Sequence, residues 1–343
     1  MAADVVTVAV DAMSGDNDPQ ASIDGARAAV ATDHELRMQL VGRRSALSSA
    51  THERIDIVEA SEVIGMDEHP AQAVRSKKDA SVLAACREVA QGRANAAVSA
   101  GNSGATLAAA VFAVKRIPGV HRPAIGGALP TAVGTTFLLD IGANTDCKAE
   151  WLLQFGVMGD VYARQMMGVA RPRVGLLSNG EEATKGSQMV QEAHALLSRS
   201  NLLFIGNVEG RDLLTGKVDV VVTDGFTGNI ALKTAEGVAE FLFATISREA
   251  RASFAGRIGG ALLKPRLRPL RDRVDYRKAG GALLLGVSGE VVIAHGRSDA
   301  VAMSNAIAVA ARAARQKVSL RIGEELGQMN HMAAPQPAQT LKS

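Results

Sequence analysis

The feature that most constrains this chain is an apolar strand that breaks into glycine and small polar residues just before a helix. Residues 218–223 form a valine-rich strand pattern, residues 224–229 read Asp-Gly-Phe-Thr-Gly-Asn, and a long helical pattern begins at Ile230. We expect such a junction to present free backbone N–H groups and the positive end of a helix dipole. In α/β proteins, junctions of this kind bind phosphate-bearing ligands outside the carboxyl ends of the strands.

The same kind of junction recurs at residues 97–106 and 137–144. One junction is weak evidence, because every βα unit needs a turn. Several junctions rich in Gly, Asn and Asp predict one composite anion-binding site at the sheet edge where the strands end.

Apolar runs of strand length alternate with helical patterns along the chain. This alternation predicts an α/β fold with a mostly parallel sheet flanked by helices on both faces. The predicted strands are 5–10, 36–41, 55–58, 96–99, 124–129, 135–140, 173–177, 202–206, 218–223 and 291–295. The predicted helices are 20–32, 70–91, 103–115, 149–167, 186–199, 228–251 and 298–316.

Two regions depart from this alternation. Residues 236–278 are helical in pattern without an intervening strand, and we include them in a single α/β domain of residues 1–330. Residues 331–343 have the composition of a tail and are expected to be disordered.

Composition limits the classes of partner. The net charge of the 343 residues is only +3, and aromatic residues make up 3%, so the chain lacks the basic and aromatic surface of a nucleic-acid binder. Cys86 and Cys147 form no disulfide framework, which indicates the reducing cytoplasm. There is no signal-peptide pattern and no apolar run of the ~18 residues that a spanning helix needs. Any membrane contact is therefore expected to be peripheral.

The first candidate ligand-binding residues follow the strands predicted at 5–10 and 96–99. Asp11 comes directly off a buried strand and could hydrogen-bond a ligand. Gly101, Asn102, Ser103 and Gly104 offer amides and a hydroxyl at a helix start. Helix capping is the alternative interpretation of this second group, and the sequence does not decide between them.

The loop at 140–148 contains two carboxylates, an amide and an amine. Asp140 and Asp146 could bind Mg²⁺, but no His or further acid adds metal-ligand spacing. We favour a role in which these polar side chains position a ligand, with Asn144 as a candidate ligand-binding residue. We expect neither a metal nor a cofactor. Cys147 is interpreted as a small packing residue.

Lys185 lies just before Gly186, at the start of a predicted helix. A cation beside a helix N-terminus is electrostatically unfavourable unless an anion lies between them, so this placement indicates an anion site. His295 follows the last predicted strand and could donate to a phosphate or protonate a leaving group, although a histidine at a strand end is more often structural. The chain shows no obvious covalent nucleophile, which fits a reaction whose substrate, such as inorganic phosphate, is the nucleophile.

Segments spread along most of the chain closely resemble, in the same order, those of the bacterial PlsX family. They are Asp-Ala-Met-Ser-Gly-Asp at 11–16, Ser-Ala-Gly-Asn-Ser-Gly-Ala at 99–105, Arg-Pro-Ala at 122–124, Leu-Asp-Ile-Gly-Ala-Asn at 139–144, Lys-Gly at 185–186, Phe-Ile-Gly-Asn-Val-Glu-Gly at 204–210, Val-Val-Thr-Asp-Gly-Phe-Thr-Gly-Asn at 221–229, Gly-Gly-Ala at 280–282 and Ala-His-Gly at 294–296. Ser14, Ser103, Ala149 and Leu283 depart from the family's usual residues, and all four are interpreted as changes of loop geometry.

The resemblance implies an acyl-carrier-protein:phosphate acyltransferase. Such an enzyme moves a fatty acyl group from acyl carrier protein to inorganic phosphate, giving acyl phosphate for phosphatidic acid and phospholipid synthesis. It also implies a homodimer with a fold similar to phosphate acetyltransferases and isocitrate-dehydrogenase-like enzymes.

That mechanism needs groups that position phosphate and stabilise an oxyanion. Lys185, Asn102 and the loop at 224–229 are the candidates, with His295 or Asp224 as a proton shuttle. Within the loop the candidate residues are Asp224, Gly225, Thr227, Gly228 and Asn229.

Residues 248–278 contain ten basic and three acidic residues, a net charge of +7. Within them lies an apolar run at 258–263. The plainest interpretation is a solvated face with a few packed leucines. A basic patch would also steer acidic acyl carrier protein, and apolar residues flanked by basic ones suit an anionic membrane. The candidate contact residues are Ile258, Leu262, Leu263, Lys264, Arg266 and Arg268.

The resemblance favours both acyl carrier protein and a membrane as partners of this segment, because family members act beside the membrane-bound glycerol-3-phosphate acyltransferase. Three other functions are alternatives to this one. A phosphate acetyltransferase would use a small acyl-CoA, and a dehydrogenase of the related fold would need a GxGxxG fingerprint, which is missing. A non-catalytic membrane scaffold would not need Lys185, Asn102 and Asn229, which are all present.

Overall fold

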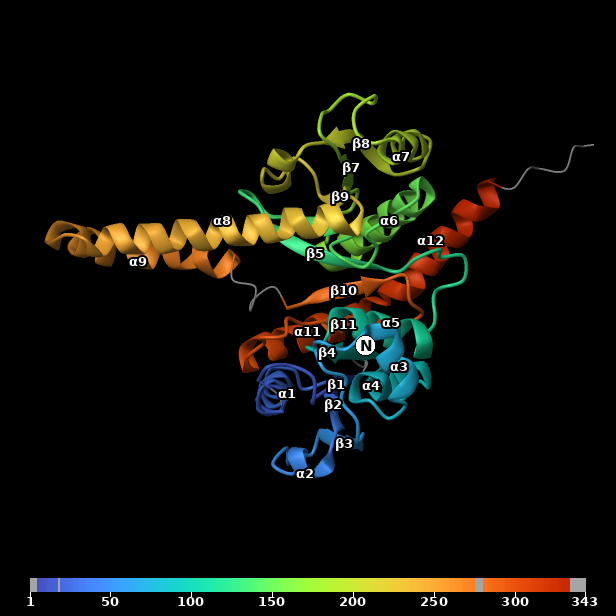
Figure 1. Ribbon diagram of the computed structural model, residues 1–343, viewed down its shortest axis with the longest axis vertical. Coiled ribbons are helices and arrows are strands. Elements are labelled where there is room, and N and C mark those ends of the chain that lie inside the picture. The colour runs from blue at the N-terminus through green and yellow to red at the C-terminus, as the bar shows by residue number, and fades with distance from the viewer. Residues whose placement is uncertain (1–4, 18, 275–279, 334–343) are drawn as a thin grey trace, which may run out of the picture.

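In the computed structural model, which describes residues 5–17, 19–274 and 280–333, eleven strands form one sheet (Figure 1). Their order across the sheet is β3-β2-β1-β4-β11-β10-β5-β6-β9-β7-β8. The strands are β1 Val6–Asp11, β2 Leu36–Gly42, β3 Ile55–Glu59, β4 Ala96–Ser99, β5 Ala124–Pro130, β6 Thr135–Leu139, β7 Arg173–Leu177, β8 Leu203–Val208, β9 Val220–Val222, β10 Ala282–Leu285 and β11 Glu290–Ile293.

Helices cover both faces of this sheet, so the predicted mostly parallel α/β fold is confirmed. The helices of the body are α1 Gln20–Thr32, α2 Arg44–Leu47, α3 Pro70–Ser76, α4 Ser81–Ala90, α5 Ser103–Ala113, α6 Ala149–Tyr162, α7 Gln188–Ser198, α11 Ala300–Gln316 and α12 Val318–Ala333. A π-helical turn, η1 Ala163–Met167, extends α6, and a 3₁₀ turn, η2 Gly210–Leu214, follows β8.

Strand β1 shows why the strands read as continuous apolar runs. Val6, Val8 and Val10 pack with α1 and α11 on one face, whereas Ala9 packs with α4 on the other. Alternate residues of a strand point to opposite faces, so a strand covered on both sides has no polar face. Almost all of the packing is supplied by Ala, Val, Leu and Ile, which lets the helices approach closely.

The direction of the strands reverses in the middle of the sheet. β4 and β11 are parallel, β10 is antiparallel to both β11 and β5, and β5 is antiparallel to β6, which is parallel to β9. β4 and β9 therefore point in opposite directions. The expectation that all the junctions would meet at one carboxyl edge is wrong, because the β5–β6 hairpin and β10 invert the second half of the sheet.

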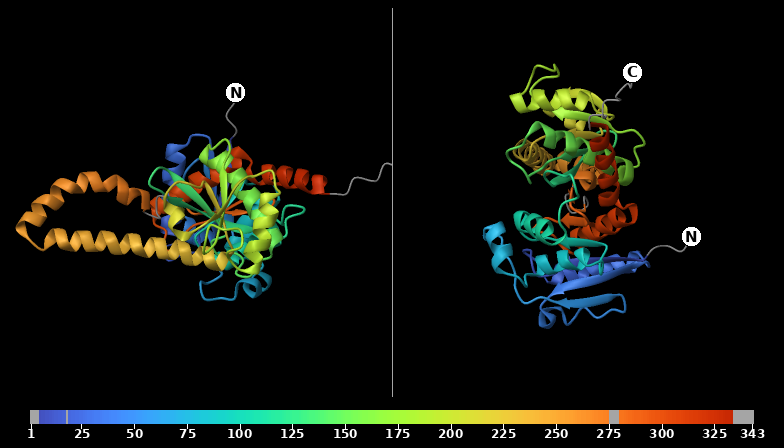
Figure 2. Two further views of the ribbon diagram at one scale, coloured as in Figure 1. Left: turned by 90° about the horizontal axis from the view of Figure 1, so that it is seen from above. Right: turned by 90° about the vertical axis from the view of Figure 1, so that its right-hand side faces the viewer.

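The longest helix leaves the body. α8 Gly225–Arg251 crosses the sheet and continues beyond it, where α9 Phe254–Val274 returns alongside (Figures 1 and 2). We call residues 240–274 the arm. Among the described residues, no helix combines the length and apolar character that crossing a bilayer requires.

Three sequence-based boundaries need correction. The predicted helix at 70–91 is broken, because Asp79 accepts hydrogen bonds from the backbone and hydroxyl of Ser61, and Ser81 donates to the Glu62 carbonyl. β10 was missed. The expected tail at 331–343 begins late, since α12 continues to Ala333, and residues 334–343 lie outside the described residues. So do Asp275, Arg277 and Lys278 of the basic segment.

Candidate functional site

A cavity of about 420 Å³ lies between α8 and the sheet. Its floor comes from β5, the start of β10 and the loop after β6, and its roof comes from the first part of α8. Most of its lining is apolar, including Ile125, Ile141, Leu129 and Leu232. Its polar lining residues are Ser103, Asn229, Lys233, Glu236, His295 and Ser298. The cavity thus combines an apolar wall with a group of hydrogen-bonding side chains.

Helix α8 contributes two adjacent stripes to this cavity. Asn229, Lys233 and Glu236 are spaced i, i+4, i+7 and form a polar stripe. Leu232, Ala235 and Ala239 have the spacing i, i+3, i+7 and form an apolar stripe. Lys233, Glu236 and Ser298 were missed in the sequence. The helical spacing from Asn229 was the signal that could have found the first two.

His295 lines the same cavity as the polar stripe. Its Nδ1 accepts a hydrogen bond of 3.1 Å from the Arg297 backbone N–H, which places the ring proton on Nε2 when the imidazole is neutral. Burial lowers the pKa of His295, and the positive charges of Lys233 and Arg297 lower it further. The ring is therefore neutral at neutral pH and can act as an Nε2–H hydrogen-bond donor. Ser298 fixes this turn by donating its hydroxyl to the His295 carbonyl, at 2.6 Å.

Asp140 organises the base of the cavity. Its carboxylate accepts four backbone hydrogen bonds, from Ile125, Gly142, Ala143 and Asn144, and one from the Asn144 side chain, at 2.8–3.1 Å. Burial raises the pKa of Asp140, and these hydrogen bonds oppose the rise. Because both of its oxygens are already bonded, Asp140 serves as a structural centre for the 140–144 loop.

Asn144 connects that loop to its neighbours. Its side-chain Nδ2 donates to the Pro123 carbonyl, and its own carbonyl accepts from the Gly225 backbone at 2.7 Å. Cys147 is buried beside it, with Sγ 3.5 Å from the same carbonyl, and burial raises the pKa of its thiol to about 12. These contacts give Asn144 and Cys147 packing and positioning roles.

The start of α8 is packed against the same loop. A Cβ atom at Gly228 would lie 1.9 Å from the Asp140 carbonyl oxygen, and one at Gly225 would lie 2.7 Å from the Asn144 carbonyl oxygen. Both glycines are therefore needed for the close approach of the helix to the loop. Asn229, one residue further along, is exposed in the cavity.

The backbone amides at this helix start are not the free donors that the sequence predicted. Gly225 donates to Asn144, Thr227 donates to the Asp224 side chain at 2.9 Å, and Gly228 donates to the Asp224 carbonyl. The Asp224 carboxylate caps the helix, which is the ordinary role of Asp at this position. An anion bound here would have to replace these contacts. In the polar stripe, Lys233 is likewise paired with Glu236, at 2.8 Å.

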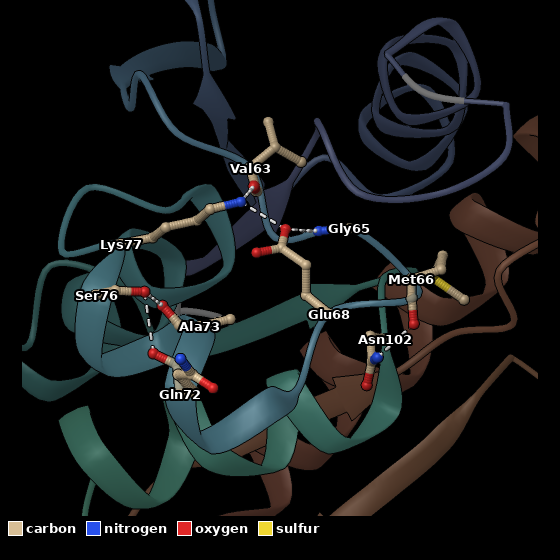
Figure 3. A network of polar contacts seen from close by, with 9 residues as sticks. All are labelled: Val63, Gly65, Met66, Glu68, Gln72, Ala73, Ser76, Lys77 and Asn102. Atoms are coloured by element: carbon tan, nitrogen blue, oxygen red, sulfur yellow. Dashed lines mark hydrogen bonds and ion pairs between the residues drawn. The ribbon is translucent and has the colours of Figure 1, made fainter.

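The junction after β4 is also held by internal contacts. Asn102 caps α5 through its Oδ1, which accepts from Ala105 at 3.1 Å, and its Nδ2 donates to the Met66 carbonyl at 2.7 Å (Figure 3). Nδ2 has a second hydrogen, so a catalytic contact of Asn102 stays a prediction. Ser103 reaches the cavity.

The glycines of this junction permit close packing. A Cβ at Gly101 would lie 2.7 Å from the Ser14 Cβ, and one at Gly104 would lie 2.7 Å from the Pro70 ring. Asp11 is fully buried and accepts a 2.7 Å hydrogen bond from the Ser99 hydroxyl. Burial raises its pKa. Asp11 lies outside the cavity lining, and the geometry gives it a structural role.

Lys185 lies in a second hollow of about 520 Å³, together with Asn179, Glu181, Glu209 and Arg211. The lining residues of this hollow are distinct from those of the cavity under α8. β7 and β9 are neighbouring parallel strands, so Lys185 and Asn229 follow strand ends at the same edge of the sheet. The structure thus brings Asn229, Ser103 and His295 together, whereas Lys185 lies outside the lining of their cavity.

Three carboxylates of the described residues could hold a cation. Ligand atoms of Glu181, Glu209 and Asp212 lie within 4.8 Å of one another. All three are already paired, because Glu181 and Glu209 both form ion pairs with Arg211, and Asp212 forms one with Lys217. The cluster therefore has its own counterions.

The arm carries the residues predicted to contact a membrane or a carrier. Ile258, Leu262 and Leu263 are exposed, Leu262 to 76%. Lys264, Arg266 and Arg268 are exposed close to them. Further exposed apolar side chains lie on both helices, at Phe241, Leu242, Ile246 and Phe254. The interpretation that the leucines pack inside this chain is therefore wrong.

Comparison with known proteins gives one consistent group of relatives. The family model described as "Fatty acid synthesis protein" matches residues 6–321. The phosphate acyltransferase of Pelotomaculum thermopropionicum is 48% identical over 324 residues, covering 93% of each chain. That of Bacillus licheniformis is 44% identical over 324 residues, covering 94% of this chain and 98% of the relative.

Two solved structures have a similar fold. The EutD phosphotransacetylase from Staphylococcus aureus has a TM-score of 0.60 at 17% identity, covering 90% of this chain and 94% of that chain. A phosphotransacetylase from Streptococcus pyogenes has a TM-score of 0.59 at 16% identity, covering 91% and 94%. At these identities the likeness shows the fold alone.

Proposed function

The chain belongs to the fatty acid synthesis protein family and is a phosphate acyltransferase, and from that premise we propose that its acyl donor is acyl carrier protein. The acyl group would pass from the carrier thioester to inorganic phosphate. The product, an acyl phosphate, would supply phosphatidic acid and phospholipid synthesis. The observation that carries this proposal is the cavity under α8, where an apolar wall meets Asn229, Ser103 and His295.

The chemistry needs no covalent intermediate. An oxygen of hydrogen phosphate attacks the thioester carbonyl, the C–S bond breaks, and the proton of the phosphate ends on the leaving sulfur. The enzyme has to hold phosphate close to the carbonyl and stabilise the oxyanion that develops. A neutral His295, donating from Nε2, and the Asn229 amide are suitable donors for that oxyanion.

Phosphate is assigned to the polar end of the cavity, beside Asn229, with Lys185 as a further ligand. Lys185 and the end of β9 lie at the same edge of the sheet, and Lys185 is exposed. We assign Lys185 to phosphate binding, and Asp224 to capping α8 rather than proton transfer, because its carboxylate already accepts from Thr227.

The arm supports two proposals about partners. Its exposed basic residues would attract acidic acyl carrier protein and the anionic surface of a membrane. Its exposed apolar residues would then insert peripherally into that membrane or pack against a second copy of this chain in a homodimer. Peripheral attachment would place the enzyme near the membrane-bound acyltransferase that uses its product.

The direct test is to incubate the protein with palmitoyl acyl carrier protein and inorganic phosphate and to measure acyl phosphate by mass spectrometry. We expect acyl phosphate and free carrier thiol in equal amounts. Substituting acetyl-CoA for the acyl carrier protein separates this activity from a phosphate acetyltransferase. Acetyl phosphate formed faster than palmitoyl phosphate would overturn the proposed donor.

A further inference from the structure

Two small residues of α8, Ala235 and Ala239, line the apolar side of the cavity. We propose that these two alanines set the length of the acyl chain that the enzyme accepts. This inference rests on the proposed function, because it assigns the acyl chain of that reaction to a defined part of the cavity.

The floor of this subsite is β5. Ile125, Gly127 and Leu129 are alternate residues of the strand, so their side-chain positions share the face that lines the cavity. A Cβ atom at Gly127 would lie 2.8 Å from Cδ1 of Ile141, another lining residue. Glycine inside a strand weakens it and often marks a place where a ligand approaches the backbone. Gly127 therefore leaves room for the Ile141 side chain, which packs over the middle of the floor.

The roof is the apolar stripe of α8. With a rise of ~1.5 Å per residue, Ala239 lies about 15 Å along the helix from Asn229. On the floor, Ile125 and Pro130 are five residues apart and about 17 Å from each other at ~3.4 Å per residue. Roof and floor thus match in length and together form a slot suited to an extended hydrocarbon chain.

The position of the polar groups determines which end of the slot holds the thioester carbonyl. The reacting carbonyl belongs beside Asn229 and His295, at the start of the roof. The chain then passes Ala235 before it reaches Ala239. A side chain larger than alanine at either position would occupy the slot, and the position nearer to the carbonyl would exclude shorter chains.

The test uses Ala235→Leu and Ala239→Leu, with hexanoyl, dodecanoyl and palmitoyl acyl carrier protein as donors. A pocket contact worth one or two methylene groups changes kcat/KM by roughly tenfold or more. We expect Ala239→Leu to lower the palmitoyl-to-hexanoyl ratio of kcat/KM at least tenfold. Ala235→Leu should also lower the dodecanoyl-to-hexanoyl ratio by that factor. Circular dichroism confirms that the variants are folded, as expected because leucine is a good helix former.

Ala244→Leu is the matched control, because Ala244 is exposed on the same helix and lies outside the cavity lining. Its chain-length ratios should equal those of the wild type. If the wild type is active and all three variants keep its ratios, the assignment of the acyl chain to this slot is overturned while the proposed function stands. If the wild type makes no acyl phosphate from any donor, the proposed function itself fails.

Discussion

Helix α11 buries seven of its seventeen residues against the sheet, whereas α8, which is ten residues longer, buries only Gly225 and Gly228. Both helices contain a similar supply of apolar side chains. In α11 these side chains are alanine, isoleucine and methionine, packed in the largest core cluster. In the arm they are phenylalanine, leucine and isoleucine, and they face outward. Apolar residues therefore stabilise the body, but in the arm they are available to a partner.

This difference predicts that substitutions in the body and at the root of α8, residues 225–228, change the free energy of unfolding. Substitutions in the arm should instead change association with a partner. A core exchange alters packing that folding depends on. Replacing an exposed arm residue removes few contacts that stabilise the isolated chain. Each of the following predictions tests one side of that contrast.

The largest effect is expected at the root of α8. Gly228→Ala would place a methyl group 1.9 Å from the Asp140 carbonyl oxygen, and a backbone atom cannot move aside cheaply. We expect the free energy of unfolding to fall by about 3 kcal/mol or more, as for severe overpacking, and acyl phosphate formation to be lost. Urea denaturation followed by circular dichroism measures the first, and the acyl phosphate assay the second.

Gly237→Ala is the matched control on the same helix. Apart from the helix's own backbone, no atom lies within 4 Å of a Cβ at this position, so the substitution should raise helix stability by up to about 1 kcal/mol. If the two substitutions destabilised the protein equally, the contrast between the packed root and the solvated side of α8 would be wrong.

Lys185→Ala tests a functional residue of the body that contributes little packing. The side chain is exposed, so the unfolding transition should not move. Loss of a phosphate contact should reduce kcat/KM for phosphate roughly 100-fold, on the scale of one lost oxyanion-type interaction. Lys78→Ala, at an exposed lysine elsewhere, should be neutral. Near-normal turnover of Lys185→Ala at sub-saturating phosphate would remove this residue from the site.

Glu290 provides a pH-dependent test of burial in the body. Its carboxylate, at the start of β11, accepts a 2.8 Å hydrogen bond from the Ser319 backbone, and burial raises its pKa to about 7 from the ordinary 4.5. The folded state thus binds this proton more tightly than the unfolded state. Its contribution to stability is present below pH 4.5 and is lost as the pH rises through about 7.

Glu290→Gln should therefore stabilise the protein at pH 8 relative to the wild type, by about 2 kcal/mol, with a smaller change at pH 5. Glu249→Gln, at an exposed position of the arm, should leave stability unchanged at both values of pH. Urea titrations at pH 5 and pH 8 measure the free energy of unfolding of each variant. A Glu290→Gln effect that is the same at pH 5 and pH 8 would show that this carboxylate does not titrate in that range.

The smallest effect is expected from the arm. Replacing Leu262 and Leu263 with Glu should weaken flotation with anionic vesicles roughly tenfold, because both apolar insertion and charge attraction are reduced. Stability and turnover of soluble acyl carrier protein should be retained. Added salt should weaken binding of the wild type as well.

Leu320→Glu, at an exposed leucine of α12 outside the arm, is the control and should float like the wild type. Equal flotation of the double variant would assign the arm to a protein contact instead. Sedimentation of the double variant would then be expected to show a loss of dimers.

The sequence was most informative where local chemistry decides structure. The alternation of apolar strands and helices predicted the α/β class, because a strand covered on both faces must be apolar throughout. The Asp224-to-Asn229 junction was expected to precede a helical pattern beginning at Ile230, but α8 begins at Gly225, because the Asp224 side chain caps the helix there. The high density of basic residues in the arm predicted a solvated surface, and the described residues of the arm are largely exposed. These properties depend on residues that are close in the sequence.

The remaining features depend on the direction and packing of distant strands. β10 is antiparallel to both β11 and β5, and the β5–β6 hairpin then reverses the remaining strands, so Asn102 and Asn229 follow opposite edges. No local pattern encodes the insertion of β10 between β11 and β5, and β10 itself was overlooked.

By itself, then, the sequence determined the fold class and the family, and it named three of the six polar residues that line the cavity, Ser103, Asn229 and His295. Only the tertiary structure decided that α8 crosses the sheet to bring Asn229, Ser103 and His295 around one cavity, and that the helix-start amides are already bonded. The physical reason is that hydrogen-bond partners and shared cavities are set by the packing of elements far apart in the chain, which residue type and spacing along the sequence do not specify.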